Sequence, residues 1–580
     1  MHQAPRAFSS PSKTIGFLVD WLDGAYQSQI LEGARDAARD RRVHLLCFAG
    51  GMLGNELRGG ARRNATFDLA SPENVDGVIL MSGSIGNKIG AENLLLYCQR
   101  FRDLPRVSVA VELPGMASIV VDNRTGIESA ITHLIRSHAC RQLAFVRGPA
   151  ANPEAELRYE VYRSVLSAHD LPFDEGLVVS GNFLTDSGKS AIFELFRERG
   201  RRPDAIVCAN DQMAIGVLEA LAELRVKVPE DVAVVGFDDI EEARFTSPPL
   251  TTVRQPLYEQ GREAVRLLLA EVYGGPRGER VTLHTEFVAR RSCRCFTEDS
   301  ILALGTFPKR ASFEAALIER RQLVLADLAR AARGGFGLLG AGWESRLIAA
   351  LTADLRGESS AAFSTCVEDA LLKLLEQRAD FNLFHDVLSA LRRHLLGCLE
   401  ADPERRAQAE DIFQSARRLV GQVSERAQAQ QKLVMSRWSG ALAHAGAALL
   451  SSFEPQHLAA AVAEYFPALG IRSCFLVLNG GRADEPGKLA VAYAESGFRD
   501  LEAASRRRLD LPRWLLDAGV AGSFYVATVF SEDRVLGYAL LDLGTREGVV
   551  YEALREFLGA ALRGAALNER ARITLAPPAG

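Results

Sequence analysis

Three short polar residues, Asn210, Asp211 and Asp238, stand where predicted strands end. Asn210 and Asp211 follow the apolar run 205–209, and Asp238 comes shortly after the apolar run 232–235. Between the two runs, apolar residues recur three and four positions apart, which predicts a helix joining two parallel strands. Side chains just beyond the carboxyl ends of parallel strands face the crevice where ligands bind. Carboxylate and amide groups at this place indicate binding of a polar, hydroxyl-bearing ligand rather than catalysis.

The first half of the chain repeats this alternation of strand and helix. Strands separated by helices predict a parallel sheet with right-handed crossovers. The module begins a second time near residue 120, which predicts two α/β lobes that close on a ligand by a hinge. Strands are expected at 14–20, 44–48, 75–81, 106–111, 143–148 and 177–181, and helices at 24–39, 92–102, 125–137, 155–169 and 187–199, with the polar SGSIGN segment at 82–87 as a loop.

Several stretches of this half resemble a known family. AFVRGP, CANDQMAIGVLEAL and VPEDVAVVGFDDIEEARFTSPPLTTVRQP are similar to the effector domain of LacI/GalR regulators, a periplasmic-binding-protein-like fold of type 1, and the similarity covers about residues 14–296. The resemblance implies a small polar effector such as a sugar or nucleoside. It also implies that the chain returns to the first lobe near 254–273 and finishes as a strand on the second lobe. The family's effector contacts map onto Arg158, Asn210 and Asp238, with Asp20, Trp21 and Ser82 lining the first-lobe side.

Four of these candidates have a second interpretation. The fork of donors on Arg158 suits ring hydroxyls, which favours ligand contact, although the residue could also lie on a helix surface. Asn210 could cap the helix that follows it, and Asp238 could serve only as a turn residue. Trp21 could stack on a sugar face or fill the interface between the lobes.

The chain differs from the family at its N-terminus. Only thirteen residues precede the first predicted strand, and residues 1–13, rich in Ser and Pro, are expected to be disordered. The family's helix-turn-helix and minor-groove hinge helix are therefore expected to be absent. How the chain would contact DNA stays open, with an unrecognised surface or a partner protein as the two possibilities.

The second half changes character and is expected to add two further folded units. Residues 297–440 have an almost wholly helical pattern and predict a bundle that ends in a long connector helix, which could pair with its copy in a homodimer. Residues 441–570 predict an α+β domain that resembles a GAF-type sensory domain in layout only. Residues 571–580 are expected to be a disordered tail.

Composition limits the function of the 580 residues. The formal net charge of -5 gives no general attraction to nucleic acid or to anionic membranes. No apolar stretch reaches the roughly 18 residues of a membrane span, which predicts a cytoplasmic protein. The nine cysteines are interpreted as reduced thiols. Cys293 and Cys295 form a C-R-C pair without a second pair spaced for zinc, so we expect structural surface cysteines and no metal.

These observations predict a regulator and not an enzyme. The chain lacks nucleophile–base pairs at motif spacing, and we expect no catalytic residues and no cofactor. The leading hypothesis is a cytoplasmic, sugar-sensing regulator of LacI/GalR type that passes lobe closure to the helical and GAF-like domains and to a separate output protein. The alternative is a DNA-binding transcriptional regulator that acts through an unrecognised surface or partner.

Overall fold

The computed structural model divides into two compact units, one made of residues 1–295 with 440–580 and the other of residues 296–439. In the described part of the chain, no helix is long and apolar enough to span a bilayer. The structure describes residues 13–55, 60–295, 313–332, 339–376, 383–399, 402–452, 454–478, 488–494, 522–531, 534–544 and 548–575.

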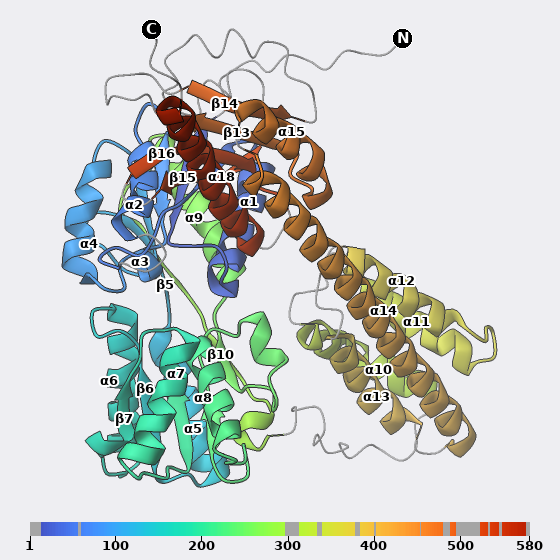
Figure 1. Ribbon diagram of the computed structural model, residues 1–580. Helices are drawn as coiled ribbons and strands as arrows, with labels where there is room; N and C mark the ends of the chain where they lie inside the picture. The colour runs from blue at the N-terminus through green and yellow to red at the C-terminus, as the bar shows by residue number, and fades with distance from the viewer. Residues whose placement is uncertain are drawn as a thin grey trace, which may run out of the picture. The chain divides into compact units, whose positions relative to one another are not determined.

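The first lobe, drawn mostly in blue in Figure 1, is built on parallel strands in the order β11-β5-β4-β3-β1-β2. Its central strands are near-continuous apolar runs, as expected for strands covered on both faces. The SGSIGN segment, predicted as a loop, contains a short helix. The elements are β1 (Thr14–Val19), α1 (Ala25–Asp40), β2 (His44–Ala49), α2 (Gly60–Asn64), β3 (Gly77–Leu80), α3 (Ser82–Ile85), α4 (Gly90–Cys98), β4 (Arg106–Val109), β5 (Ala117–Val121), α9 (Leu257–Val272) and β11 (Arg280–Leu283).

The second lobe has a parallel sheet in the order β7-β6-β8-β9. The two-lobed, parallel α/β prediction is confirmed. The predicted return of the chain to the first lobe near 254–273 is confirmed, because α9 packs into the first-lobe core. The predicted final strand on the second lobe is only partly right, because β11 joins the first lobe and only β12 pairs with β10 of the second. The elements are α5 (Asn123–His138), β6 (Leu143–Arg147), α6 (Pro153–Ala168), β7 (Val178–Ser180), α7 (Thr185–Phe193), β8 (Ala205–Cys208), α8 (Asp211–Glu223), β9 (Ala233–Val235), β10 (Thr252–Arg254), β12 (Glu286–Val288) and the 3-10 turn η7 (Arg291–Cys293).

Three chain segments cross between the lobes, after β5, after β10 and after β11. The first and third are tied together, since the Asp122 backbone N–H donates to the Leu283 carbonyl (2.9 Å) and the Thr285 hydroxyl donates to the Asp122 carbonyl (2.8 Å). A short, mutually bonded set of crossings is the geometry expected of a hinge.

The α1 and α9 helices pack against each other through glycines. A Cβ atom at Gly33 would lie 1.9 Å from the Tyr258 carbonyl oxygen, and one at Gly261 would lie 1.9 Å from the Ile30 carbonyl oxygen. Only a residue without a side chain permits this approach of two helix backbones.

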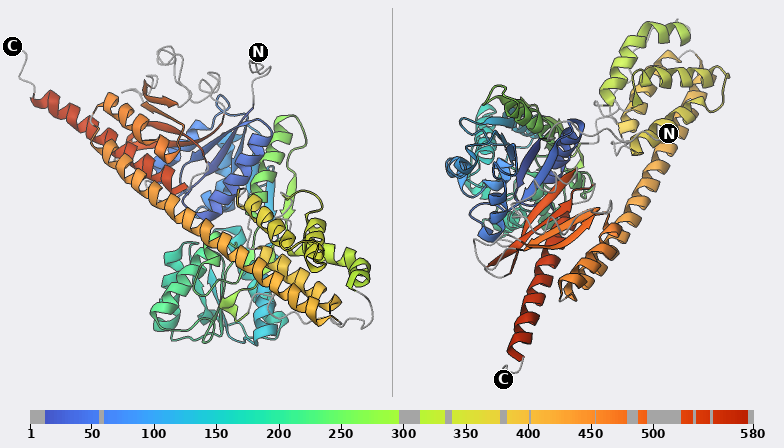
Figure 2. Two further views of the ribbon diagram at one scale, coloured as in Figure 1. Left: turned by 90° about the vertical axis from the view of Figure 1, so that its right-hand side faces the viewer. Right: turned by 90° about the horizontal axis from the view of Figure 1, so that it is seen from above.

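The C-terminal segment continues the sheet of the first lobe. Strand β15 pairs in parallel with β2, from Ser523 beside Leu45 to Val526 beside Phe48, so β15-β16-β13-β14 extend the sheet to ten strands (Figure 2, right, orange and red beside blue). The elements are α15 (Pro455–Tyr465), β13 (Ser473–Leu478), β14 (Lys488–Ala494), β15 (Ser523–Ser531), β16 (Arg534–Asp542) and α18 (Gly548–Leu575).

This arrangement corrects the prediction of a separate C-terminal unit. The segment shares one hydrophobic core with the first lobe, in which Phe48, Val526 and Leu554 are fully buried. The physical reason is the β2 edge, which is apolar and buried along its length and would otherwise present unpaired backbone groups. Helix α18 reaches Leu575, past the expected end at residue 570. Within this segment the sequence also predicts a helix near 512–517 and a turn at 532–533, and both lie outside the described residues.

A buried ion pair joins the C-terminal segment to the first lobe. The Arg63 Nη2 atom lies 2.5 Å from Glu552 Oε1, and the two side chains are only 1% and 9% exposed. Arg63 also donates from Nε to the Gly50 carbonyl, and the Thr66 and Thr528 hydroxyls are 3.0 Å apart. Burial alone would raise the pKa of Glu552, but the Arg63 guanidinium holds it below the usual value.

The second unit is helical in its described part and has its own hydrophobic core. Its chain continues into the first unit through α14, whose last turns pack Ala445 and Leu449 into the first-lobe core. The elements are α10 (Phe313–Ala331), α11 (Trp343–Leu355), α12 (Ala362–Glu376), α13 (Phe384–Cys398) and α14 (Pro403–Leu450).

Candidate functional site

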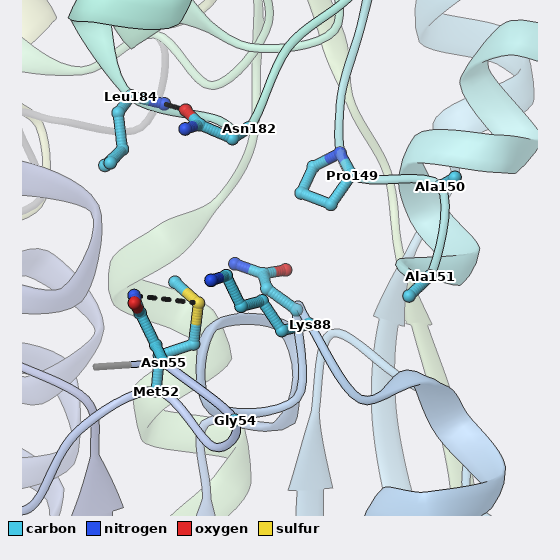
Figure 3. Close-up of a pocket in the computed structure, with 10 residues that line it drawn as sticks. Met52, Gly54, Asn55, Lys88, Pro149, Ala150, Ala151, Asn182 and Leu184 are labelled. Atoms are coloured by element: carbon cyan, nitrogen blue, oxygen red, sulfur yellow. Dashed lines mark hydrogen bonds between the residues drawn. The ribbon is translucent and has the colours of Figure 1, made fainter. Parts of the chain in front are cut away.

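A cavity of about 670 Å³ lies between the two lobes (Figure 3). Its walls come from loops after β2, β3, β6 and β7, which are carboxyl ends of parallel strands in both sheets. This is the place where open α/β sheets bind ligands. The lining residues are Met52, Gly54, Asn55, Asn87, Lys88, Pro149, Ala150, Ala151, Asn182 and Leu184.

The two lobes are hydrogen-bonded to each other beside this cavity. The Asn152 side-chain amide donates to Asn87 Oδ1 (2.6 Å) and to the Gly83 carbonyl (3.1 Å). The Oδ1 atom of Asn152 meanwhile accepts from the Ala155 backbone N–H (3.0 Å) and so caps α6. One asparagine therefore fixes the start of a second-lobe helix and holds it against the first lobe.

Arg158 lies in the second lobe and is only 2% exposed. Its Nε donates to Asn123 Oδ1 (2.7 Å) and its Nη1 to the Ala209 carbonyl (2.7 Å), while its guanidinium carbon lies 3.8 Å from the centre of the Phe237 ring. Glu154 Oε1 is 3.8 Å from Nη2. The surface interpretation of Arg158 is therefore wrong, because this side chain belongs to a buried polar cluster.

Asp238 stands at the end of the β9 segment with a φ of +132°, a conformation that L residues rarely adopt. Its Oδ1 accepts from Gln255 Nε2 (2.6 Å), and Gln255 Oε1 accepts in turn from Gln260 Nε2 (3.1 Å). Burial raises the pKa of Asp238 well above its usual value, although Arg158 opposes the shift. A chain of amides thus connects this carboxyl group through the hinge to α9 of the first lobe.

Asp20 follows β1 in the first lobe and is 1% exposed. Burial raises its pKa to about 6, against hydrogen bonds from Ser84 Oγ (2.9 Å) and the Gln27 amide (3.3 Å). Trp21 is buried beside it. Ser82 is also buried, and its hydroxyl accepts from Ser108 Oγ (2.7 Å).

Asn210 caps α8, because its Oδ1 accepts from the Met213 backbone N–H (3.0 Å). Its amide donates to the Phe183 carbonyl (3.1 Å), between two residues that line the cavity. The capping role is confirmed. A ligand contact would have to use the second amide hydrogen or the second lone pair of the side-chain oxygen. The neighbouring Asp211 accepts from the Thr252 hydroxyl (2.6 Å) and is an internal structural residue.

Three of the candidates belong to the first lobe and three to the second. Tyr26, which the sequence did not suggest, packs against the hydrophobic cores of both lobes. Its pKa is raised by burial and by Glu154, Asp238 and Asp20, with Arg158 opposing. These charged groups therefore share one electrostatic neighbourhood across the lobe junction. None of the six predicted residues lines the cavity itself, and all six are buried.

Sequence reasoning missed most of the cavity lining for an identifiable reason. Asn55, Lys88 and Asn182 sit in loops whose residue types resemble any solvent-exposed turn. The available signal was positional, since each follows a predicted strand at its carboxyl end. Asn87 and Asn152 carried no signal, because their pairing joins two lobes that are distant in sequence.

Comparisons with known proteins agree with this geometry. Residues 131–293 match the periplasmic binding protein-like domain family. The chain is 30% identical over 279 residues to the ribose operon repressor of Escherichia coli strain K12, covering 47% of this chain and 81% of the repressor. It is 28% identical over 288 residues to the HTH-type transcriptional repressor PurR of Vibrio atlanticus strain LGP32, covering 49% and 82%. A solved transcriptional regulator CelR–cellobiose complex is 29% identical with a TM-score of 0.43, covering 49% of this chain and 86% of that chain.

The fold and the interlobe cavity define a two-lobed, periplasmic-binding-protein-like ligand-sensing protein. The chain belongs to the LacI family of transcriptional regulators. The matching relatives are repressors of transcription and not enzymes, which confirms the prediction that the chain is not an enzyme.

Proposed function

We propose that the chain is a cytoplasmic regulator that binds a small polar effector, such as a sugar or nucleoside, in the interlobe cavity. The observation that carries this proposal is the cavity itself. Its volume lies within the roughly 300–1,000 Å³ typical of small-molecule sites. The side-chain amides of Asn55, Asn87 and Asn182 and the ammonium of Lys88 offer donors and acceptors for hydroxyl and carbonyl groups. Met52 and Leu184 offer apolar surface for a ring.

The buried cluster behind the cavity supports a role for Arg158, Asp238 and Asp20 in this binding. Their charges face each other across the lobe junction, so their interaction depends on how far the lobes are closed. Asn210 and Ser82 occupy supporting positions next to the walls. Trp21 is buried after β1 and does not line the cavity, which favours its interpretation as an interface residue over stacking on the ligand.

We further propose that closure is passed to the C-terminal segment through β2. The loop 52–55 that lines the cavity follows β2, and β2 pairs with β15. The proposal has further parts. The C-terminal segment has a GAF-like layout, the helical unit also receives the change, the chain forms a homodimer paired through the connector helix, and a separate output protein responds to it. Control of transcription is supported by the repressor relatives, and DNA contact is tested by mobility shift on the promoter of its own gene, with and without effector.

A thermal-shift screen of sugars, nucleosides and polyols tests the effector site. A ligand that binds the folded form raises the melting temperature with concentration, by mass action. We expect Asn55→Ala and Lys88→Ala to reduce the shift for the active compound while the melting temperature without ligand is unchanged. Lys227→Ala is the matched control, since Lys227 is an exposed second-lobe lysine away from the cavity. A compound whose shift survives both cavity variants would place the effector site elsewhere.

A further inference from the structure

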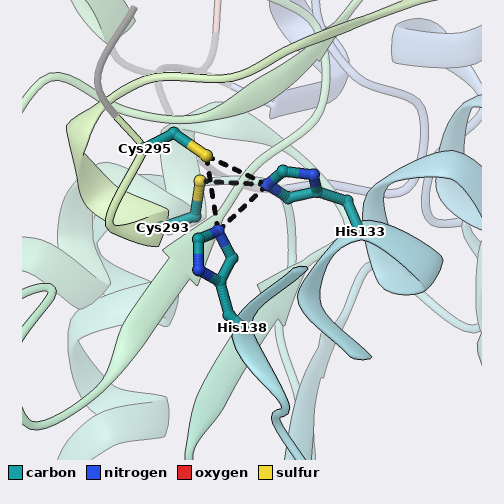
Figure 4. Close-up of side chains that lie close together, drawn as sticks. All are labelled: His133, His138, Cys293 and Cys295. Atoms are coloured by element: carbon teal, nitrogen blue, oxygen red, sulfur yellow. Dashed lines mark hydrogen bonds between the residues drawn. The ribbon is translucent and has the colours of Figure 1, made fainter. Parts of the chain in front are cut away.

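Four side chains from the first helix and the last segment of the second lobe converge at one point. His133 and His138 belong to α5, and Cys293 and Cys295 belong to the last segment before the second unit. Their four ligand-type atoms all lie within 4.8 Å of one another (Figure 4). The group is half-buried apart from Cys293, which is buried. None of the six effector candidates belongs to it.

The spacing within this Cys2His2 cluster fits a tetrahedral metal ion. The two Nε2 atoms are 3.1 Å apart, Cys295 Sγ lies 3.2 Å and 3.3 Å from the His133 and His138 nitrogens, and Cys293 Sγ lies 3.6 Å from His133 Nε2. Zinc bonds of about 2.05 Å to nitrogen and about 2.3 Å to sulfur give tetrahedral edges of about 3.3 Å between two nitrogens and about 3.6 Å between nitrogen and sulfur. The observed separations lie close to both edges.

The backbone explains how the four residues reach one point. The histidines have the H-x4-H spacing common among zinc ligands, and α5 ends directly after His138 with Ala139 in the left-handed conformation. The C-R-C spacing is shorter than that of most zinc knuckles. It is accommodated because Arg294 has a φ of +76°, which turns both cysteines toward the same side.

Hydrogen bonds around the cluster hold the cysteine-bearing segment in place. The Thr251 hydroxyl lies 2.9 Å from the Arg290 carbonyl oxygen and 3.1 Å from Cys293 Sγ, and its oxygen accepts from the Arg290 backbone N–H (2.9 Å). Arg294 lies between the two cysteines in the sequence. Its Nε and Nη2 donate to the Pro229 and Glu230 carbonyls, which hold the turn in place.

We propose that His133, His138, Cys293 and Cys295 form a structural site for a divalent, thiolate-binding metal ion, Zn²⁺ by its ligand chemistry. Two sulfur and two imidazole ligands in tetrahedral array select zinc among the divalent ions. With all four protein ligands supplied, the site is closed and stabilises structure rather than activating water. The ion would clamp the last residues of the effector domain to α5, at the point where the chain leaves for the second unit.

The test uses the full-length chain, purified without a histidine tag and under reducing conditions. We expect inductively coupled plasma mass spectrometry to find about one zinc ion per chain. The zinc content is expected to fall by at least roughly tenfold in Cys295→Ser and in His138→Asn. Cys140→Ser is the matched control, because Cys140 is a neighbouring buried thiol outside the cluster. The control is expected to keep its zinc.

Cobalt substitution of the wild-type protein gives a second readout that does not depend on variants folding. After chelation, one equivalent of Co²⁺ is expected to produce tetrahedral d–d bands and a thiolate-to-cobalt charge-transfer band, which zinc then displaces. A zinc-free protein that shows no such band, zinc retained in both cluster variants, or a Cys293–Cys295 disulfide in the reduced preparation would each overturn the proposal.

Discussion

The buried ion pair between Arg63 and Glu552 offers the sharpest test of the shared sheet. The perturbation is Glu552→Gln, which keeps the size of the side chain and removes its charge. Arg63 then stays buried, and no other carboxylate among the described residues pairs with it. Removing one partner of a buried pair leaves an uncompensated charge and costs roughly 3–5 kcal/mol.

The reverse substitution, Arg63→Met, is expected to cost less. Glu552 keeps a second cation, since Arg555 Nε lies 3.4 Å from its other oxygen and Arg555 is itself 5% exposed. Loss of one charged hydrogen bond with a partner remaining corresponds to roughly 1.5–3 kcal/mol. The expected order, Glu552→Gln worse than Arg63→Met, follows only if α18 is docked on the first lobe.

Amide hydrogen exchange of peptides from β2 and β15 measures the effect where the two segments meet. A cost of roughly 3–5 kcal/mol in local opening accelerates exchange more than about 100-fold. Glu112→Gln is the control, because it breaks an exposed pair with Arg280 (2.8 Å) on the same lobe and is expected to change exchange by less than about fivefold. Exchange in Glu552→Gln no faster than in this control would refute the shared core.

Three further outcomes are expected. Because burial raises the pKa of Asp20 from 3.8 to about 6, the folded state binds this proton more tightly and loses stability as the pH rises between these values. The free energy of unfolding of Asp20→Asn, relative to that of the wild type, should therefore increase by up to roughly 3 kcal/mol between about pH 4 and about pH 7. A melting-temperature difference that does not depend on pH would contradict this. Gly261→Ala should destabilise the first lobe by roughly 1–3 kcal/mol through its clash with the Ile30 carbonyl, whereas Gly421→Ala, in open space on a helix, should stabilise by roughly 0.5–1 kcal/mol; thermal unfolding compares them. Arg158→Met should cost roughly 3–5 kcal/mol in urea unfolding because it leaves buried carboxylates unpaired, and a loss under about 1 kcal/mol would show that those carboxyls are protonated.

The two lobes could be predicted from the sequence because each element carries its own signal. Parallel strands covered on both faces read as short apolar runs, and the helices between them keep their apolar positions three and four apart. The strand expected at 44–48, for example, is β2, His44–Ala49. The prediction of a loop for the SGSIGN segment was wrong because a one-turn helix is too short to show a periodic pattern.

The candidate site could be predicted only in its supporting part. Arg158 and Asp238 carry motif signals because their buried contacts constrain residue type closely. Residues that line the cavity, such as Asn55 and Lys88, can be recognised only from the shape of the cavity, and that shape exists only when both lobes are in place. The Cys2His2 cluster escaped for the same reason, because Cys293 and His133 approach only when the last segment returns to α5.

The pairing of β2 with β15 restricts how an effector signal can travel. Sheet pairing and a shared core make the C-terminal segment part of the first-lobe body, and a close-packed core transmits displacement instead of absorbing it. Hinge closure therefore moves the second lobe against the first lobe and C-terminal segment together. A partner that reads effector binding must accordingly contact both sides of the hinge, or respond to the second lobe alone. The His133 cluster lies on that moving lobe, at the end where the chain departs toward the helical unit.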